Sequence, residues 1–165
     1  CKVNKMKIKV LFVCMGNICR SPTAEGVFKK TISTYGLAHC FTVASAGTHA
    51  YHVGDAPDFR AQQAAMRREV DLSQKRAPKF IRGDFEDFDY ILAMDQDNFE
   101  ILSAACPVDY QSKIHYFLDF APELNTREVP DPYYGGQFGF EKVLDLVEAA
   151  SEAFLATLKA QKGLA

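Results

Sequence analysis

A cysteine and an arginine, Cys14 and Arg20, stand near the start of the chain with five residues between them, in the stretch CMGNICRS. Gly16 permits a tight turn, and Asn17 tolerates the left-handed backbone region. A short loop of this kind, placed before a helix, can direct its backbone N–H groups at one centre and bind an oxyanion. Arg20 adds a planar, charged fork that matches two phosphate oxygens. The stretch therefore predicts a phosphate-binding loop.

Cys14 lies at the base of this predicted loop. The positive field of loop amides and a helix N-terminus favours the thiolate, which is the nucleophilic form of cysteine. A thiolate beneath a bound phosphate is placed for in-line attack on phosphorus. Ser21 follows the loop and is expected to donate a hydrogen bond to the sulfur. A cysteine at the end of a buried strand is often only a small hydrophobic residue of the core. The spacing of Cys14 and Arg20 therefore indicates a catalytic loop only together with the strand before it, the Gly-Asn within it and the helix start after it.

A phosphate ester needs an acid to protonate its leaving group, and the stretch EVPDPYYGG offers Asp131 between two prolines. Tyr133 and Tyr134 follow it and favour an aromatic wall. An aspartate in a proline-flanked loop is equally typical of a simple turn, so this segment alone leaves both interpretations open.

The composition narrows the class of protein. The chain has 165 residues, of which 48% are hydrophobic and 24% are charged, and its formal net charge is −2. This length and composition predict one domain over residues 1–165. We expect residues 1–5 to be an addition ahead of Met6. The charge argues against a general nucleic-acid binder. No apolar run is long enough for a membrane span, and the start CKVNKMKIKV lacks a signal-peptide pattern. Five irregularly spaced cysteines are a poor disulfide framework, which favours the reducing cytoplasm. Because no membrane span is expected either, we predict a cytoplasmic protein without a membrane partner.

Strands and helices are expected to alternate along the chain, which predicts an α/β protein: a three-layer sandwich with a four-stranded parallel sheet and helices on both faces. The phosphate loop falls between the first strand and the first helix. Ligands of such sheets bind beyond the carboxyl ends of the strands, where Cys14 and Asp95 both lie. The expected strands are 7–13, 40–47, 88–95 and 113–120, and the expected helices are 22–36, 58–70, 96–106 and 138–161.

With these motifs in place, the chain resembles the low-molecular-weight protein tyrosine phosphatase family. The stretch VLFVCMGNICRSPTAE is similar to the phosphate-loop signature of that family, and DPYYG is similar to its general-acid loop. FDYILAMD and the SAG after the second strand are also similar to family segments, in the same order and spacing from Met6 onward.

The resemblance implies a phosphotyrosine phosphatase that needs no metal or cofactor, acts on a phosphotyrosine protein, and is inhibited by phosphate or other oxyanions. It implies that Cys14 is the nucleophile, Arg20 the phosphate clamp, and Asp131 the general acid and then the base. It assigns the other roles by position: phosphate binding to Met15, Gly16, Asn17, Ile18, Cys19 and Arg20; loop support to Asn17, Ser21 and Ser45; and substrate binding to Tyr51, Tyr133 and Tyr134.

Some positions depart from the family or leave alternatives open. A histidine that supports the loop in animal members is matched here by Gln74, so we expect that support to differ or be absent. Cys19 is either a filler of the loop or a redox partner that captures oxidised Cys14 as a disulfide, and the resemblance favours the redox partner.

Three other functions remain to be weighed against a tyrosine phosphatase. Arsenate reduction on the same scaffold needs further cysteines, and the segment 72–93 contains none. A protein arginine phosphatase carries a threonine where this chain has Ile18. A phosphotyrosine reader without turnover would lack the nucleophile or the acid, and both are present.

Overall fold

A four-stranded parallel sheet forms the centre of the protein in the computed structural model, which describes residues 7–16, 19–49, 53–132 and 136–163. The strands lie in the order β2-β1-β3-β4, as expected for crossovers that pass over the faces of a sheet. Their bounds are β1 Ile8–Cys14, β2 Phe41–Gly47, β3 Tyr90–Ala93 and β4 Ile114–Tyr116. The register pairs Cys14 with Gly47 and Val13 with Ala93, so three strands end at the same edge.

The two faces of the sheet carry separate hydrophobic clusters. Val10 and Phe12 of β1 point into the larger cluster, and Leu11 and Val13 point into the smaller one. This alternation is the period of a strand, and burial on both faces explains why the stretch is almost wholly apolar.

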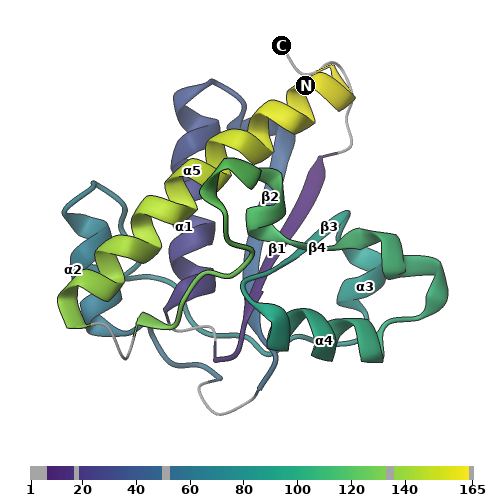
Figure 1. Ribbon diagram of the computed structural model, residues 1–165, viewed down its shortest axis with the longest axis horizontal. Helices are drawn as coiled ribbons and strands as arrows, with labels where there is room; N and C mark the ends of the chain where they lie inside the picture. The colour runs from purple at the N-terminus through teal and green to yellow at the C-terminus, as the bar shows by residue number, and fades with distance from the viewer. Residues whose placement is uncertain (1–6, 17–18, 50–52, 133–135, 164–165) are drawn as a thin grey trace.

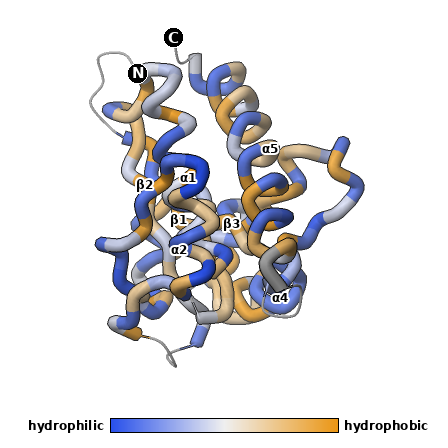
Figure 2. Tube along the Cα trace, turned by 90° about the vertical axis from the view of Figure 1, so that its left-hand side faces the viewer, coloured by the Kyte–Doolittle hydropathy of each residue, from blue (hydrophilic) through white to orange (hydrophobic). Residues whose placement is uncertain are grey.

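Helices cover both faces, so the expected three-layer arrangement is confirmed (Figure 1). On the side of the larger cluster lie α1 (Arg20–Thr34), α5 (Gly136–Lys162) and α2 (Phe59–Met66), and on the other side lie α3 (Asp84–Asp87) and α4 (Gln96–Ala105). Polar and apolar residues alternate along α5, as Figure 2 shows, which is typical of a helix with one buried face. Within the described residues, no helix has the length and apolar character needed to cross a membrane.

The fourth strand is shorter than the expected 113–120. β4 ends at Tyr116, and Phe117–Phe120 forms a 3₁₀ turn. Phe117 and Leu118 are consecutive, and both are buried in the larger cluster. Two neighbouring side chains of a strand would point to opposite faces, so the chain must leave the sheet to bury both together.

The expected helix 58–70 is also shorter, because α2 ends at Met66. Glu69 has a positive φ of 65°, and the N–H of Val70 donates to the carbonyl of Ala65 at 3.0 Å. The turn returns Val70 to the core at 6% exposure. The apolar residue Val70 is buried although it follows the end of α2, so the spacing of apolar residues predicted too long a helix.

Candidate active site

Cys14 is the last residue of β1, and only 3% of its surface is exposed. Its Sγ lies 3.0 Å from the Oγ of Ser21, in the first turn of α1, where either atom can be the donor. The expected contact between Ser21 and the sulfur is therefore present. Strand β1 and helix α1 place these two side chains together across the loop that joins them.

The loop itself is described in part. Met15, Gly16 and Cys19 are placed, whereas Asn17 and Ile18 lie outside the described residues. Cys19 precedes α1 without making a side-chain cap, and the first turn of α1 contains no acidic residue. The first N–H groups of a helix in this state are suited to an anion.

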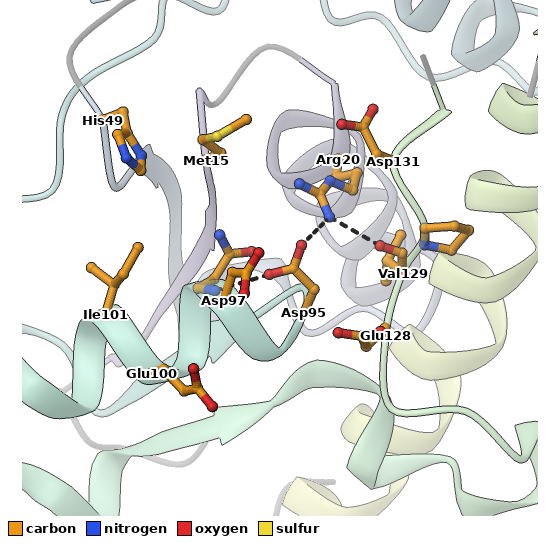
Figure 3. A pocket seen from close by; sticks show the side chains of 12 residues that line it. Met15, Arg20, His49, Asp95, Asp97, Glu100, Ile101, Glu128, Val129 and Asp131 are labelled. Carbon is orange, nitrogen blue, oxygen red and sulfur yellow. Dashed lines mark hydrogen bonds and ion pairs between the residues drawn. The ribbon is translucent and has the colours of Figure 1, made fainter. Parts of the chain in front are cut away.

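Arg20 is buried, with 6% of its surface exposed. Its Nη1 donates to Asp95 Oδ2 at 2.6 Å and to the carbonyl oxygen of Val129 at 3.1 Å (Figure 3). Burial by itself opposes the charged form, but the negative charge of Cys14 and the bond to Asp95 outweigh it, and the pKa of Arg20 is raised. Among the described residues, none accepts a hydrogen bond from Nε or Nη2, so these donors can serve a ligand.

Asp131 lies two residues beyond Val129, on a segment joined to the sheet. The N–H of Val129 donates to the carbonyl of Met94 at 2.7 Å, and Val129 is fully buried. Arg20 holds the Val129 carbonyl from the other side. In Figure 3 the carboxylate of Asp131 lies beside the guanidinium of Arg20. The structure thus brings the predicted acid to the predicted clamp.

The segment after β2 also runs along the loop. The N–H groups of Thr48 and His49 donate to the carbonyls of Cys14 and Met15, each at 2.9 Å. These bonds extend the pairing of β1 and β2 beyond the sheet. Three predicted substrate-binding side chains lie outside the described residues: Tyr51, Tyr133 and Tyr134.

Ser45 belongs to a buried polar network on the β2 side. Its hydroxyl donates to Glu25 Oε1 at 2.6 Å, and Glu25 Oε2 forms ion pairs with Lys29 at 2.8 Å and Lys75 at 3.0 Å. Burial would raise the pKa of Glu25, but the hydrogen bonds from Lys29, Ser45 and Lys75 lower it. Lys75 of this network is the neighbour of Gln74 in the sequence, and the altered loop support expected at Gln74 stays a prediction.

Cys19 is buried, with 7% of its surface exposed. Burial, followed by the nearby negative charges of Asp58, Cys14 and Asp131, raises the pKa of its thiol to about 12. The two loop cysteines therefore differ: Cys14 has a hydroxyl partner, whereas Cys19 is held in its protonated form.

Asp95 is the site residue whose role the sequence did not reveal. Its Oδ2 holds Arg20, and its Oδ1 accepts the N–H of Asn98 at 2.9 Å, which caps α4. One carboxylate thus fixes both the clamp and the start of the next helix. The available signal was its position just after β3, at the edge of the sheet where Cys14 lies.

A cavity of about 520 Å³ opens beside Arg20 and Asp131. It is lined on one side by Met15 and His49, and on the other by the first turns of α4. Among the described residues, no group of three or more His, Cys, Asp or Glu side chains is placed to hold a metal ion. A strand-end thiol, a buried guanidinium with two available donors and a nearby carboxylate are the parts that a phosphoryl-transfer site needs.

Comparison with known proteins agrees with this geometry. Residues 9–164 match the sequence profile of the low molecular weight phosphotyrosine protein phosphatases. A putative low molecular weight protein-tyrosine-phosphatase of Synechocystis sp. is 47% identical over 92% of this chain and 96% of its own length.

Solved structures give the same result. A protein tyrosine phosphatase from Entamoeba histolytica, crystallised with Hepes in its active site, superposes with a TM-score of 0.91 at 43% identity, covering 94% of this chain and 99% of that one. Wzb of Vibrio vulnificus, in complex with benzylphosphonate, has a TM-score of 0.79 at 29% identity, with 92% and 99% covered. The fold is that of these phosphatases. The chain belongs to the low molecular weight protein-tyrosine-phosphatase family.

Proposed function

We propose that this protein hydrolyses phosphotyrosine in protein substrates through a phosphocysteine intermediate on Cys14. The observation that carries the proposal is the position of Cys14 Sγ, buried at the end of β1 and 3.0 Å from Ser21 Oγ. A sulfur with a hydroxyl partner, at the start of a helix and near a guanidinium, is placed to act as a nucleophile towards a bound phosphate.

In the first step the Cys14 thiolate attacks phosphorus, and the bond between phosphorus and the tyrosine oxygen breaks. Asp131 gives its proton to that oxygen as it leaves. Negative charge develops on the equatorial oxygens, where Nε and Nη2 of Arg20 and the amides of residues 15–20 supply donors. Preorganised donors of this kind are most effective in a site shielded from water.

In the second step the Asp131 carboxylate takes a proton from water, and the resulting hydroxide attacks phosphorus. The phosphorus–sulfur bond breaks, the thiolate of Cys14 leaves, and inorganic phosphate is released. The hydroxyl of Ser21 stabilises the departing sulfur, while Asn17 and Ser45 keep the shape of the loop. Neither step calls for a metal ion or an organic cofactor.

Substrate selection follows from the walls of the site. Tyr51, Tyr133 and Tyr134 grip the ring of the substrate, so an aryl phosphate is preferred over phosphoserine, whose stem is shorter. The bulk of Ile18 favours a tyrosine ring over phosphoarginine. Inorganic phosphate and other oxyanions compete for the same donors, in line with the Hepes and the benzylphosphonate bound by two relatives.

Arsenate reduction is the weaker alternative. The segment 72–93 has no cysteine, and Cys106, just after α4, is 9% exposed with its Sγ directed at the carbonyl of Pro107. The segment 72–93 therefore offers no thiol to carry electrons away, as arsenate reduction on this scaffold requires.

Cys19 gives the site a protective redox step. Peroxide oxidises Cys14 to the sulfenic acid, which condenses with the Cys19 thiol to form a disulfide and water. Because the pKa of Cys19 is about 12, its thiolate is scarce and this capture is slower than for an ordinary thiol. We expect Cys19→Ser to lose the recovery by dithiothreitol that wild type shows after peroxide treatment. Equal recovery in both proteins would remove Cys19 from this role.

The proposed reaction is tested by offering phosphotyrosine, phosphoserine and phosphoarginine peptides side by side at mildly acidic pH, with a chelator present. We expect phosphate release from phosphotyrosine and none with Cys14→Ser, which retains anion binding. Release chiefly from phosphoarginine would overturn the argument from Ile18. In addition, Asp131→Asn is expected to slow substrates with poor leaving groups more than those with good ones, and equal slowing would contradict its role as the acid.

A further inference from the structure

The cavity beside Arg20 has a wall of carboxylates that the proposed reaction does not use. Asp97 and Glu100 reach it from the first turns of α4, and Glu128 reaches it from the segment that leads to Asp131 (Figure 3). All three are exposed. The cavity is continuous with the catalytic residues, because Arg20 and Asp131 line it as well.

This wall has an excess of negative charge. Asp95 is neutralised by Arg20, but within the described part of the chain Asp97, Glu100 and Glu128 form no ion pair. Glu100 accepts a hydrogen bond from the side-chain amide of Gln96 at 2.7 Å, and Glu128 accepts one from the Gln96 backbone at 2.9 Å. A phosphoryl dianion entering the loop therefore approaches a surface of its own sign, unless the substrate brings a cation with it.

A buried acceptor stands in the same wall. Asn98 lines the cavity and is 2% exposed, and its Oδ1 receives no hydrogen bond from any described residue. A buried carbonyl oxygen without a donor is unfavourable and rare in native proteins. The wall thus combines surplus negative charge with an unmet acceptor, and both are complementary to a group that carries positive charge and several N–H donors.

We propose that this cavity is a subsite for a lysine or arginine side chain that flanks the phosphotyrosine in the protein substrate. The inference rests on the proposed function and narrows its substrate class. The positively charged end of this side chain lies against Asp97 and Glu100. Its N–H groups face the part of the wall that contains Asn98. Met15 and Ile101, which are 45% and 42% exposed, flank the aliphatic stem. A volume of about 520 Å³ accommodates such a side chain.

The test uses synthetic phosphotyrosine peptides on an alanine background, with arginine, alanine or glutamate placed at each position near the phosphotyrosine. We expect arginine to raise kcat/KM over alanine about fivefold at one or two positions, the size expected for a partly exposed charge pair, and glutamate to lower it. The arginine-to-alanine ratio is expected to shrink as salt is added, because exposed charges are screened.

The matched variants carry equal changes in charge. In Asp97→Asn/Glu100→Gln the arginine-to-alanine ratio is expected to fall toward one. In Asp109→Asn/Glu123→Gln, where both side chains are exposed and neither lines the cavity, the ratio is expected to stay at its wild-type value.

The outcomes separate the two proposals. A wild-type ratio near one at every position, with phosphotyrosine hydrolysed, would overturn the subsite and leave the proposed reaction standing. A ratio that persists in Asp97→Asn/Glu100→Gln would also overturn it, since the preference would arise elsewhere. Absence of hydrolysis with every phosphotyrosine peptide would remove the proposed reaction and the subsite together.

Discussion

Helix α1 carries two buried charges that have opposite kinds of surroundings. Arg20 is 6% exposed and bonds through Nη1 alone to Asp95 and Val129, so Nε and Nη2 have no acceptor among the described residues. Glu25 is 8% exposed, and both of its oxygens are engaged by protein groups. A buried charge with donors to spare serves a ligand, whereas a fully engaged charge holds the chain together. Under the proposed function, this difference separates the part of the helix that binds the substrate from the part that stabilises the fold.

Among the changes that test this comparison, Arg20→Lys is expected to have the largest effect. Lysine keeps the charge but loses the planar fork, so kcat/KM for an aryl phosphate is expected to fall about 10³-fold. The melting temperature is expected to change little, because an ammonium can still pair with Asp95. Steady-state kinetics and a thermal melt on the same sample test both statements. A large loss of stability with unchanged kcat/KM would place Arg20 in the same class as Glu25.

Asp95→Asn is expected to have the next largest effect. The amide oxygen still accepts from the N–H of Asn98, so α4 keeps its cap, but the charge that holds Arg20 is lost. Losing one charge-assisted hydrogen bond predicts about a tenfold fall in kcat/KM. Asp109→Asn is the control, because Asp109 is exposed and does not line the cavity. Equal kinetics for Asp95→Asn and wild type would show that Arg20 needs no partner to keep its position.

Glu25→Gln tests the structural charge. Because the pKa of Glu25 is lowered in the folded protein, its carboxylate stabilises the fold above the ordinary pKa of glutamate, and this contribution is lost as pH falls through the folded value. We expect the variant to lose about 2 kcal/mol at neutral pH, the size of a hydrogen bond to a charged group, with a shallower decline in acid. Urea unfolding at neutral and acidic pH measures both.

Two results would change the interpretation of Glu25. Lys29→Gln is its control, because the Lys29 side chain is 48% exposed and its pair is screened by solvent, so the expected loss is small. A loss of activity in Glu25→Gln as large as that in Arg20→Lys, without loss of stability, would contradict a structural role.

The smallest effect is expected from Arg68→Gln. Arg68 joins the end of α2 to α5 through Glu141, Asp145 and Glu148, at 2.8 to 3.0 Å, with its own side chain 24% exposed. Partly exposed pairs of this kind contribute little, so we expect a loss of about 1 kcal/mol in urea unfolding and an unchanged kcat. A loss of stability larger than that of Glu25→Gln would show that the burial of an ion pair does not determine how much it stabilises this fold.

Local features of the sequence predicted most of the fold. The apolar run before Cys14 predicted β1, and Gly36 marked the end of α1, where its φ is 71° and the N–H of Leu37 donates to the carbonyl of Ile32 at 2.7 Å. The bounds were least accurate where apolar residues continued past the element, at Phe117 after β4 and at Val70 after α2. The ends of these elements depend on which residues the tertiary structure buries in the core. The periodic spacing of apolar residues in the sequence does not show this.

Within the candidate site, the contacts made over a few residues were predictable and the distant ones were not. Cys14 and Ser21 are seven positions apart, so one strand, one loop and one helix turn suffice to bring them together. The partners of Arg20 are 75 and 109 positions away, at Asp95 and Val129. No spacing rule connects residues so far apart.

The sequence alone determined the spacing of Cys14 and Arg20 around the predicted loop, the order of strands and helices, and the family, because these depend on short stretches whose physical requirements are local. The tertiary structure decided which carboxylate holds Arg20, that Lys75 engages Glu25, and that the wall beside the site is acidic. The first and the last of these features arise where β1, β3 and the segment before Asp131 meet at the edge of the sheet, whereas Lys75 reaches Glu25 on the β2 side, where Ser45 lies. These contacts form when segments that are distant in the sequence pack together. The residue pattern within a single segment carries no information about such packing.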